Sequence, residues 1–222
     1  MTQGTSEHTT LQDQLRELVC NRAERAVCCQ KNFELTEGTA ITDPRELPFM
    51  VYIHLKNGRG SVECGASIVA SEFLITAKHC LSKFDDGCQE ESQCTASFRD
   101  LDKSTYEEGE FDIPIFDVIE HPGKSDLALV QLIMPFESHP DYGKGVPLKP
   151  VKLASRPPRP QEKVQTAGWG RTGFKEPESD KLLALNLTVT RVTDTYIYTD
   201  VHNAAGKITD TCSGKFWLYF VN

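Results

Sequence analysis

Short apolar segments separated by turn-forming residues constrain the fold of this chain most strongly. Runs rich in Val, Ile, Leu and Phe lie between polar, Gly or Pro segments, and several of them alternate apolar and polar side chains. Such alternation is typical of strands with one buried face. The runs occupy 49–55, 62–70, 72–77, 111–119, 127–132 and 185–192. The pattern predicts an all-β barrel or sandwich rather than a parallel α/β sheet.

Two regions interrupt this series of expected strands. Residues 11–29 are compatible with one short helix followed by clustered cysteines. Residues 133–162 form a Pro-rich connector, and such a segment is the best candidate for a boundary between two β-units. We therefore expect two β-units joined by this connector.

Length and charge exclude several classes of protein. A chain of 222 residues can bury a sizeable core as one large domain or as a small module plus a domain. Its formal charge of −8 argues against a nucleic-acid partner, which needs a basic surface. The sequence contains no run of ~18 apolar residues, so we expect no transmembrane helix and no membrane partner.

The eight cysteines indicate an oxidising compartment. None shows the C-x-x-C spacing of a zinc site, so the set resembles a disulfide framework. The N-terminal stretch MTQGTSEHTTLQDQLREL has no apolar core of the kind that signal peptides contain. We expect an extracellular protein whose start lies upstream, or else a chain that is not exported as written.

One histidine and one aspartate lie where strands meet loops. In LITAKHC, His79 ends an apolar run beside Cys80, and Cys64 lies sixteen residues earlier. A disulfide that closed this loop would fix the imidazole. In HPGKSDLALVQL, Asp126 lies at the start of another apolar run, where a carboxylate can hold a neutral imidazole in one tautomer.

These motifs, in this order, resemble the chymotrypsin-like serine proteases. The matching segments are CGASIVASEFLITAKHC, SDLALVQL, TAGWGRTG and DTCSG, within about 35–214. The resemblance implies a double β-barrel whose first barrel is complete and whose second is incomplete, with no cofactor and no metal. It assigns His79 as general base, Asp126 as its orienting carboxylate, Asp210 as the floor of the specificity pocket and Gly214 as an oxyanion-hole donor.

The family pattern stops after Gly214. The family continues with Asp-Ser-Gly-Gly-Pro, whereas this chain has Lys215 to Tyr219 in the order KFWLY. Ser213 lies three residues before the nucleophile's position and cannot replace it, because the nucleophile depends on the tight turn after Gly214. The tail is compatible with translated intron sequence or with an alternatively spliced terminus. Its uncharged run FWLYFV also predicts poor solubility, which removal of 215–222 would improve.

The front of the chain is similar to the end of a clip domain, the Cys-rich module of invertebrate proteases, or is an unrelated Cys-rich linker. We expect three regions: a partial clip-like segment at 1–34, an incomplete trypsin-like domain at 35–214 and a tail at 215–222. Residues 33–35 read FEL, so no Arg or Lys activation site precedes the domain.

The sequence leaves the pairing of several cysteines and the modification of one asparagine undecided. Cys88 and Cys94 are expected to close a small local disulfide. Pairing of Cys20, Cys28, Cys29 and Cys212 is undetermined. Asn186, in the triplet NLT, is a glycosylation acceptor if the chain is secreted.

Two functions remain from the sequence. The first is a secreted trypsin-like serine endopeptidase that cleaves after Arg or Lys, with this chain inactive because the nucleophile is missing. The second is a non-catalytic homologue that binds and regulates a partner in a protease cascade. The expected partners are therefore protein substrates or cascade proteins.

Overall fold

The structure is a computed structural model that describes residues 38–57, 60–81, 94–123, 126–170, 177–193 and 197–199, together with the backbone of 217–220. Several residues named from the sequence lie outside these ranges: Cys20, Cys28, Cys29, Cys88, Asp210, Cys212 and Gly214. The expected clip-like segment at 1–34 lies outside them too. Within the described part of the chain, no helix is long and apolar enough to cross a membrane.

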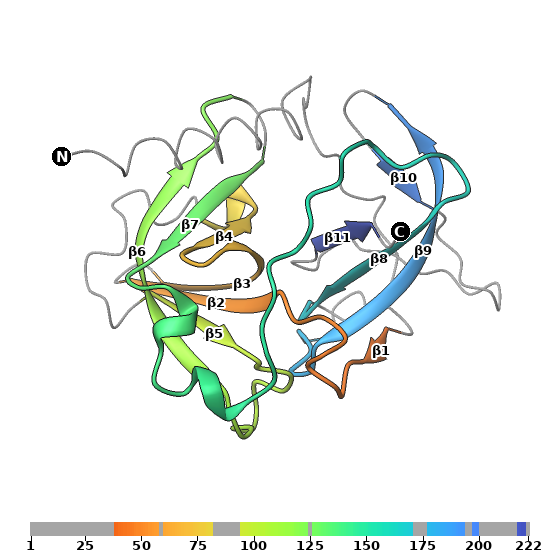
Figure 1. The fold of residues 1–222 in the computed structure, drawn as a ribbon. Coiled ribbons are helices and arrows are strands. Elements are labelled where there is room, and N and C mark those ends of the chain that lie inside the picture. Colours follow the sequence, from red (N-terminus) through yellow and green to blue (C-terminus); the bar gives the residue numbers. More distant parts are fainter. Residues whose placement is uncertain are drawn as a thin grey trace.

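Six antiparallel strands close into a barrel in the first half of the molecule (Figure 1). In sheet order they are β2 (Met50–Asn57), β3 (Gly60–Ala70), β4 (Phe73–Thr76), β7 (Ala128–Leu132), β6 (Phe111–Glu120) and β5 (Cys94–Phe98). β5 pairs with β2 and completes the ring. Closure leaves none of these strands with a free edge along its paired length.

Alternation along the strands builds the core of this barrel. In β5, Cys94, Ala96 and Phe98 are buried, whereas Thr95 and Ser97 between them are partly exposed. The ring of Phe98 stacks on Phe111 of β6 with centroids 5.0 Å apart. Phe136, in the 3-10 turn η3 (Phe136–Ser138), also packs on Phe98, with ring centroids 6.0 Å apart. The barrel interior is thus filled by side chains.

The second half is an open sheet of five strands. Its order is β1 (Thr39–Ala40), β9 (Leu183–Val192), β8 (Lys163–Gly168) and β11 (Trp217–Phe220), and β10 (Ile197–Thr199) also pairs with β9. Buried Val164, Leu185, Leu187 and Val189 form its own apolar cluster. The expected all-β fold, with a closed first barrel and an incomplete second one, is confirmed.

The tail contributes a strand to this open sheet. The backbone of β11 pairs antiparallel with β8, and the register places Trp217 opposite Ala167 and Phe220 opposite Val164. The sequence had suggested that the uncharged apolar run of the tail lowers solubility. In the structure the tail's backbone instead covers one edge of β8.

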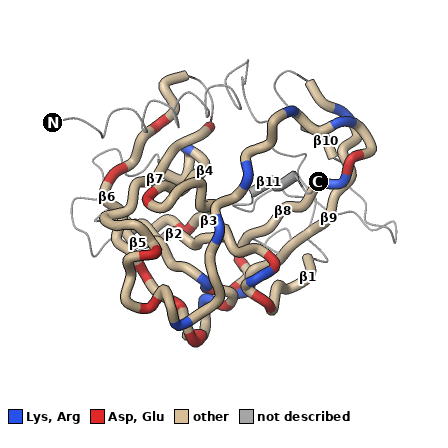
Figure 2. Tube along the Cα trace, in the orientation of Figure 1, with Lys and Arg blue, Asp and Glu red and all other residues tan. Residues whose placement is uncertain are grey.

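The Pro-rich connector runs between the two halves, as its composition predicted. It leaves the first barrel after β7 and enters the second half at β8, and it contains η3 and the 3-10 turn η4 (Tyr142–Lys144). Figure 2 shows Lys and Arg residues spaced along this segment. Its backbone N–H at Val151 donates to the carbonyl of Ile68 in β3 at 2.8 Å, which ties the connector to the barrel.

A third apolar cluster joins the halves. It combines Met50 and Tyr52 of β2 with Trp169, which follows β8, and with Leu182 and Ala184 near and in β9. Tyr52 meets Trp169 edge-on with ring centroids 5.4 Å apart. Because this cluster takes residues from both sheets, the halves pack as one body along this seam.

Candidate active site

His79 lies in a one-turn 3-10 helix, η1 (Lys78–Cys80), directly after β4. Buried Leu74, Ile75 and Thr76 fix the end of β4 in the barrel. The hydroxyl of Thr76 donates to the carbonyl of Gly65 in β3 at 2.9 Å. The position of η1 is therefore set by a strand that cannot slide without breaking the barrel.

A disulfide fixes η1 from the other side. Cys80, next to His79, is bonded to Cys64 of β3, with Cα atoms 6.2 Å apart. Both cysteines are almost fully buried. The expected Cys64–Cys80 bridge is confirmed, and it holds the turn that carries His79 against β3.

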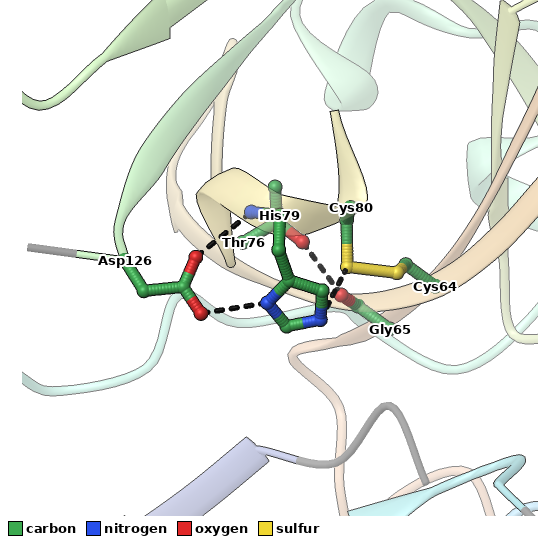
Figure 3. The surroundings of a disulfide bond; sticks show 6 residues. All are labelled: Cys64, Gly65, Thr76, His79, Cys80 and Asp126. Carbon is green, nitrogen blue, oxygen red and sulfur yellow. Dashed lines mark hydrogen bonds and ion pairs between the residues drawn. A yellow bond between two sulfur atoms is a disulfide. The ribbon is translucent and has the colours of Figure 1, made fainter. Parts of the chain in front are cut away.

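Asp126 meets His79 with both carboxylate oxygens (Figure 3). Asp126 precedes β7, the strand that pairs with β4, so the pairing of these strands brings the two residues together. The backbone N–H of His79 donates to Oδ1 at 2.8 Å, and Nδ1 of the imidazole lies 2.6 Å from Oδ2. This double contact fixes both the carboxylate and the plane of the ring.

The carboxyl group of Asp126 is held in its ionised form. The side-chain hydrogen bond from His79 lowers the pKa of Asp126 most, and the backbone N–H groups of His79 and Lys78 lower it further, against the opposing effect of burial. An ionised carboxylate can only accept hydrogen bonds. Nδ1 of His79 must therefore carry the proton, which leaves the lone pair on Nε2 in the neutral ring.

Both side chains of the His79–Asp126 pair are partly open to solvent. The side chain of His79 is 63% exposed and that of Asp126 is 43% exposed. Nε2 lies 3.8 Å from the sulfur of Cys80. A disulfide sulfur has no hydrogen to donate, so the contact with Cys80 does not itself place a donor on Nε2.

Lys78 departs from the small residue that the family pattern has before the histidine, and the structure gives it a partner. Its ammonium group forms an ion pair with Glu120, the last residue of β6. Both side chains are more than one third exposed, so the pair contributes little to stability. Its effect is local, because it links the turn of His79 to the strand next to Asp126.

The structure does not place the other proposed site residues. Asp210 and Gly214 lie outside the described ranges. Cys94 at the start of β5 is disulfide-bonded, but Cys88 lies outside them as well. Its pairing with Cys88 therefore stays a prediction.

Sequence reasoning missed a small pocket at the seam between the halves. Its walls include Tyr52, Glu63, Lys103, Trp169 and Glu178. Lys103 donates to the carboxylate of Glu63 at 3.0 Å and lies 5.0 Å from the ring centre of Tyr52. No local signal marks these residues, because they meet only through the register of strands far apart in the chain. Within the described ranges, no cluster of His, Cys, Asp and Glu residues could hold a metal ion.

Comparison with known proteins gives a consistent result. A family model described as Trypsin matches residues 36–215. Granzyme B of Rattus norvegicus is 25% identical over 174 residues, which cover 77% of this chain and 66% of that protein. Mast cell protease 2 of Ovis aries is 27% identical over 168 residues, or 72% of this chain and 63% of that protein.

Two further matches extend this picture. CLIP domain-containing serine protease B4 of Anopheles gambiae is 26% identical over 168 residues, covering 67% of this chain and 45% of that protein. The solved structure titled "Structure of GrC" is similar in fold, with a TM-score of 0.57 and 24% identity over 70% of this chain and 66% of that chain. The chain thus spans between 45% and 66% of the length of these four proteins.

Proposed function

Because this chain belongs to the trypsin family of serine proteases, we propose that its protein is a trypsin-like serine endopeptidase with His79 as general base and Asp126 as the carboxylate that orients it. The observation that carries the proposal is the 2.6 Å contact between Nδ1 of His79 and Oδ2 of Asp126. This contact fixes the tautomer that a base at Nε2 requires.

The chemistry follows from that tautomer. Nε2 takes the proton of a serine hydroxyl as its oxygen attacks the carbonyl carbon of a peptide bond. The imidazolium that forms is stabilised by ionised Asp126 and then gives its proton to the leaving amine. In the imidazolium, N–H at Nε2 also faces the sulfur of Cys80, a weak acceptor.

The remaining roles rest on sequence motifs alone. Asp210 would hold the Arg or Lys side chain of the substrate, and the backbone N–H of Gly214 would donate to the oxyanion. The substrates would be proteins. The disulfides support an extracellular location, because such bonds persist in oxidising compartments.

The 222-residue chain does not perform this chemistry by itself. Lys215 to Tyr219 occupy the positions at which the family has Asp-Ser-Gly-Gly-Pro, so the family's nucleophilic serine is missing from its motif position. In well-studied serine proteases, loss of one triad member costs up to about 10⁶-fold in kcat. We expect no measurable hydrolysis of an arginyl substrate by this chain.

A second function is favoured by the same residues. A chain without a nucleophile and without an Arg or Lys activation site at 33–35 fits a non-catalytic homologue that binds and regulates a partner in a protease cascade. We further propose that 1–34 is a partial clip-like segment, 35–214 an incomplete protease domain and 215–222 a tail foreign to the family.

The direct test uses the purified chain with an organophosphonate active-site probe and an arginyl chromogenic substrate. Stoichiometric labelling would show a working nucleophile and refute the claim of inactivity. No labelling is expected.

A chimaera tests the assigned roles. Residues 1–214 are continued with the Asp-Ser-Gly-Gly-Pro segment and final strands of an active family member, and Arg-Ile-Val replaces residues 34–36 to provide an activation site. This chimaera should cleave after Arg or Lys.

In the same chimaera, Asp126→Asn should lower kcat by about 10⁴-fold, and Asp210→Ser should abolish the preference for basic residues. Cleavage after aromatic residues by the parent chimaera would remove Asp210 from the pocket.

A further inference from the structure

We propose that Asn186 is a site of N-linked glycosylation, placed on the outer face of the open second sheet. The triplet Asn186, Leu187, Thr188 is the acceptor motif, and the inference rests on the extracellular route proposed above. In the reaction, Nδ2 of Asn186 attacks the first sugar of a lipid-linked oligosaccharide pyrophosphate. A new C–N bond forms, the C–O bond to the lipid pyrophosphate breaks, and the amide loses one proton.

The register of β9 decides which way the acceptor faces. Leu185, Leu187 and Val189 are buried in the apolar cluster of the second half. Asn186 alternates with them and is exposed, and Thr188 lies on the same face as Asn186 and is partly exposed. Because side chains two apart share a face of a strand, both acceptor residues lie on the solvent side.

The contacts of Asn186 leave the reacting nitrogen in a suitable place. Gln165, directly opposite on β8, donates from Nε2 to Oδ1 of Asn186 at 3.2 Å. Lys163, opposite Thr188, donates to its hydroxyl oxygen at 2.7 Å. The cross-strand bond to Asn186 uses the amide oxygen, so a sugar on Nδ2 does not require this bond to break.

The described strands leave part of one edge of β9 unpaired. On the side of β9 away from β8, β1 pairs only with Leu183 and Ala184, and β10 pairs only from Val189 onward. No described strand pairs with 185–188 on that side. A sugar on Asn186 would therefore displace no paired strand, and the buried face below it would be unchanged.

Attachment of a glycan here would change the surface of the half that the fold leaves open. An oligosaccharide would cover the polar outer face of β8 and β9, beside Gln165 and Lys163. Glycans are bulky and solubilising. The site is thus placed where a glycan can oppose sheet-to-sheet association of the second half.

The test secretes the full chain from cultured animal cells behind an appended, cleavable signal. The intact mass and a peptide map are measured before and after treatment with a peptide-N-glycosidase, which converts a modified asparagine into aspartate. We expect a carbohydrate mass on the peptide that contains residue 186, and its conversion to aspartate. Thr188→Ser should keep the modification, whereas Thr188→Ala and Asn186→Gln should abolish it.

An unmodified Asn186 in the secreted chain would overturn the proposal. So would a glycan confined to aggregated material, because the outer face would then not tolerate it in the folded sheet. The appended signal supplies the route, so either result is independent of whether the protein is natively secreted and of its proteolytic activity.

Discussion

Arg99 shows how a single residue can hold a loop and the connector together. It is only 5% exposed, and its guanidinium donates to three carbonyls, those of Val146, Gly109 and Tyr142, at 2.7 to 2.8 Å. Its φ of 64° lies in the left-handed region, which costs a non-glycine residue about 1–2 kcal/mol. Burial lowers the pKa of Arg99. The charged hydrogen bonds offset both costs.

Gly145 of the connector lies against the guanidinium of Arg99. A Cβ atom at this position would come within 2.8 Å of Nη1 of Arg99. The backbone of the connector can therefore reach the guanidinium only because residue 145 has no side chain.

We predict that Arg99→Met lowers the free energy of unfolding by about 2–4 kcal/mol, since one buried and two partly buried carbonyls lose their donor. Denaturant unfolding measures this change. Arg45→Met is the matched control: Arg45 is exposed and forms an ion pair with Asp43, so its loss should change the free energy of unfolding by about 0.5 kcal/mol or less. Equal effects of the two substitutions would refute the role of Arg99.

Asp100 and Glu110, two carboxyl groups near Arg99, have raised pKa values, from which we predict that stability depends on pH. Burial, followed by the charge of Glu107, raises the pKa of Asp100 to about 6. Burial also raises the pKa of Glu110 to about 7. One oxygen of each lies buried without a hydrogen-bond partner in the described part of the chain. Figure 2 shows other acidic residues along this part of the first barrel.

The sign of this pH dependence follows from whether the folded or the unfolded chain binds protons more tightly. Between the unfolded and folded pKa values, which for Asp100 are 3.8 and about 6, the folded chain binds more protons than the unfolded chain. The free energy of unfolding therefore falls as pH rises through about 4 to 7. Asp100→Asn should raise Tm by a few degrees at pH 8 and have little effect at pH 4.

Asp102→Asn provides the control for this prediction. Hydrogen bonds from Ser104 lower the pKa of Asp102, so its ionised form is the one that the fold favours. Its substitution should not raise Tm at pH 8. A Tm gain from Asp100→Asn that is the same at pH 4 and pH 8 would show that ionisation is not the cause.

At the scale of elements, β11 changes what the tail is expected to do. Its backbone pairs with Val164 to Ala167 of β8, and a strand edge of this kind is open to another chain when it is not covered. The sequence alone predicted that removal of 215–222 improves solubility. The pairing favours the opposite result, because removal uncovers the backbone N–H and C=O groups of β8.

We therefore predict that deletion of 215–222 lowers the soluble fraction and the hydrogen-exchange protection of 164–167. Proline substitution separates the pairing from the composition of the tail. In an antiparallel ladder neighbouring residues point their N–H groups to opposite sides, so one of Leu218→Pro and Tyr219→Pro must remove a donor to β8. Higher solubility of the deleted chain with unchanged protection of β8 would support the earlier expectation.

At the scale of the whole molecule, the seam around Trp169 determines whether the halves unfold together. Trp169 is 4% exposed and packs on Tyr52 of the first barrel. We predict that Trp169→Ala lowers the free energy of unfolding by about 3–5 kcal/mol and separates the transitions of the halves. Denaturant unfolding followed by hydrogen exchange at β5 and at β9 would show two midpoints.

Phe136→Ala is the control for that separation. Phe136 is almost fully buried, but its contacts lie within the first barrel. Phe136→Ala should lower the free energy of unfolding by a similar amount, but it should not separate the unfolding transitions of the two halves as Trp169→Ala does. A single midpoint for Trp169→Ala would show that the halves are coupled elsewhere.

The sequence by itself determined the strongly apolar strands and the pair of residues at the candidate site. The runs at 49–55, 62–70 and 111–119 became β2, β3 and β6 with ends shifted by two residues or fewer. Their side chains bury enough apolar surface to fix a strand locally. His79, Cys64 and Asp126 were recognised from the short motifs around them, since each motif combines a strand end with a chemically distinctive residue.

Tertiary structure alone decided the elements whose own residues carry weak preferences. β5 reads CTASF and β10 has three residues, and each forms because a neighbouring strand supplies its hydrogen bonds. The same is true of β11, which completes an edge of β8, and of the buried cation of Arg99. The pocket at the seam, with Lys103 on Glu63, also exists only through register. Such contacts join residues far apart in the chain, and their energy depends on burial and pairing that no local stretch of sequence contains.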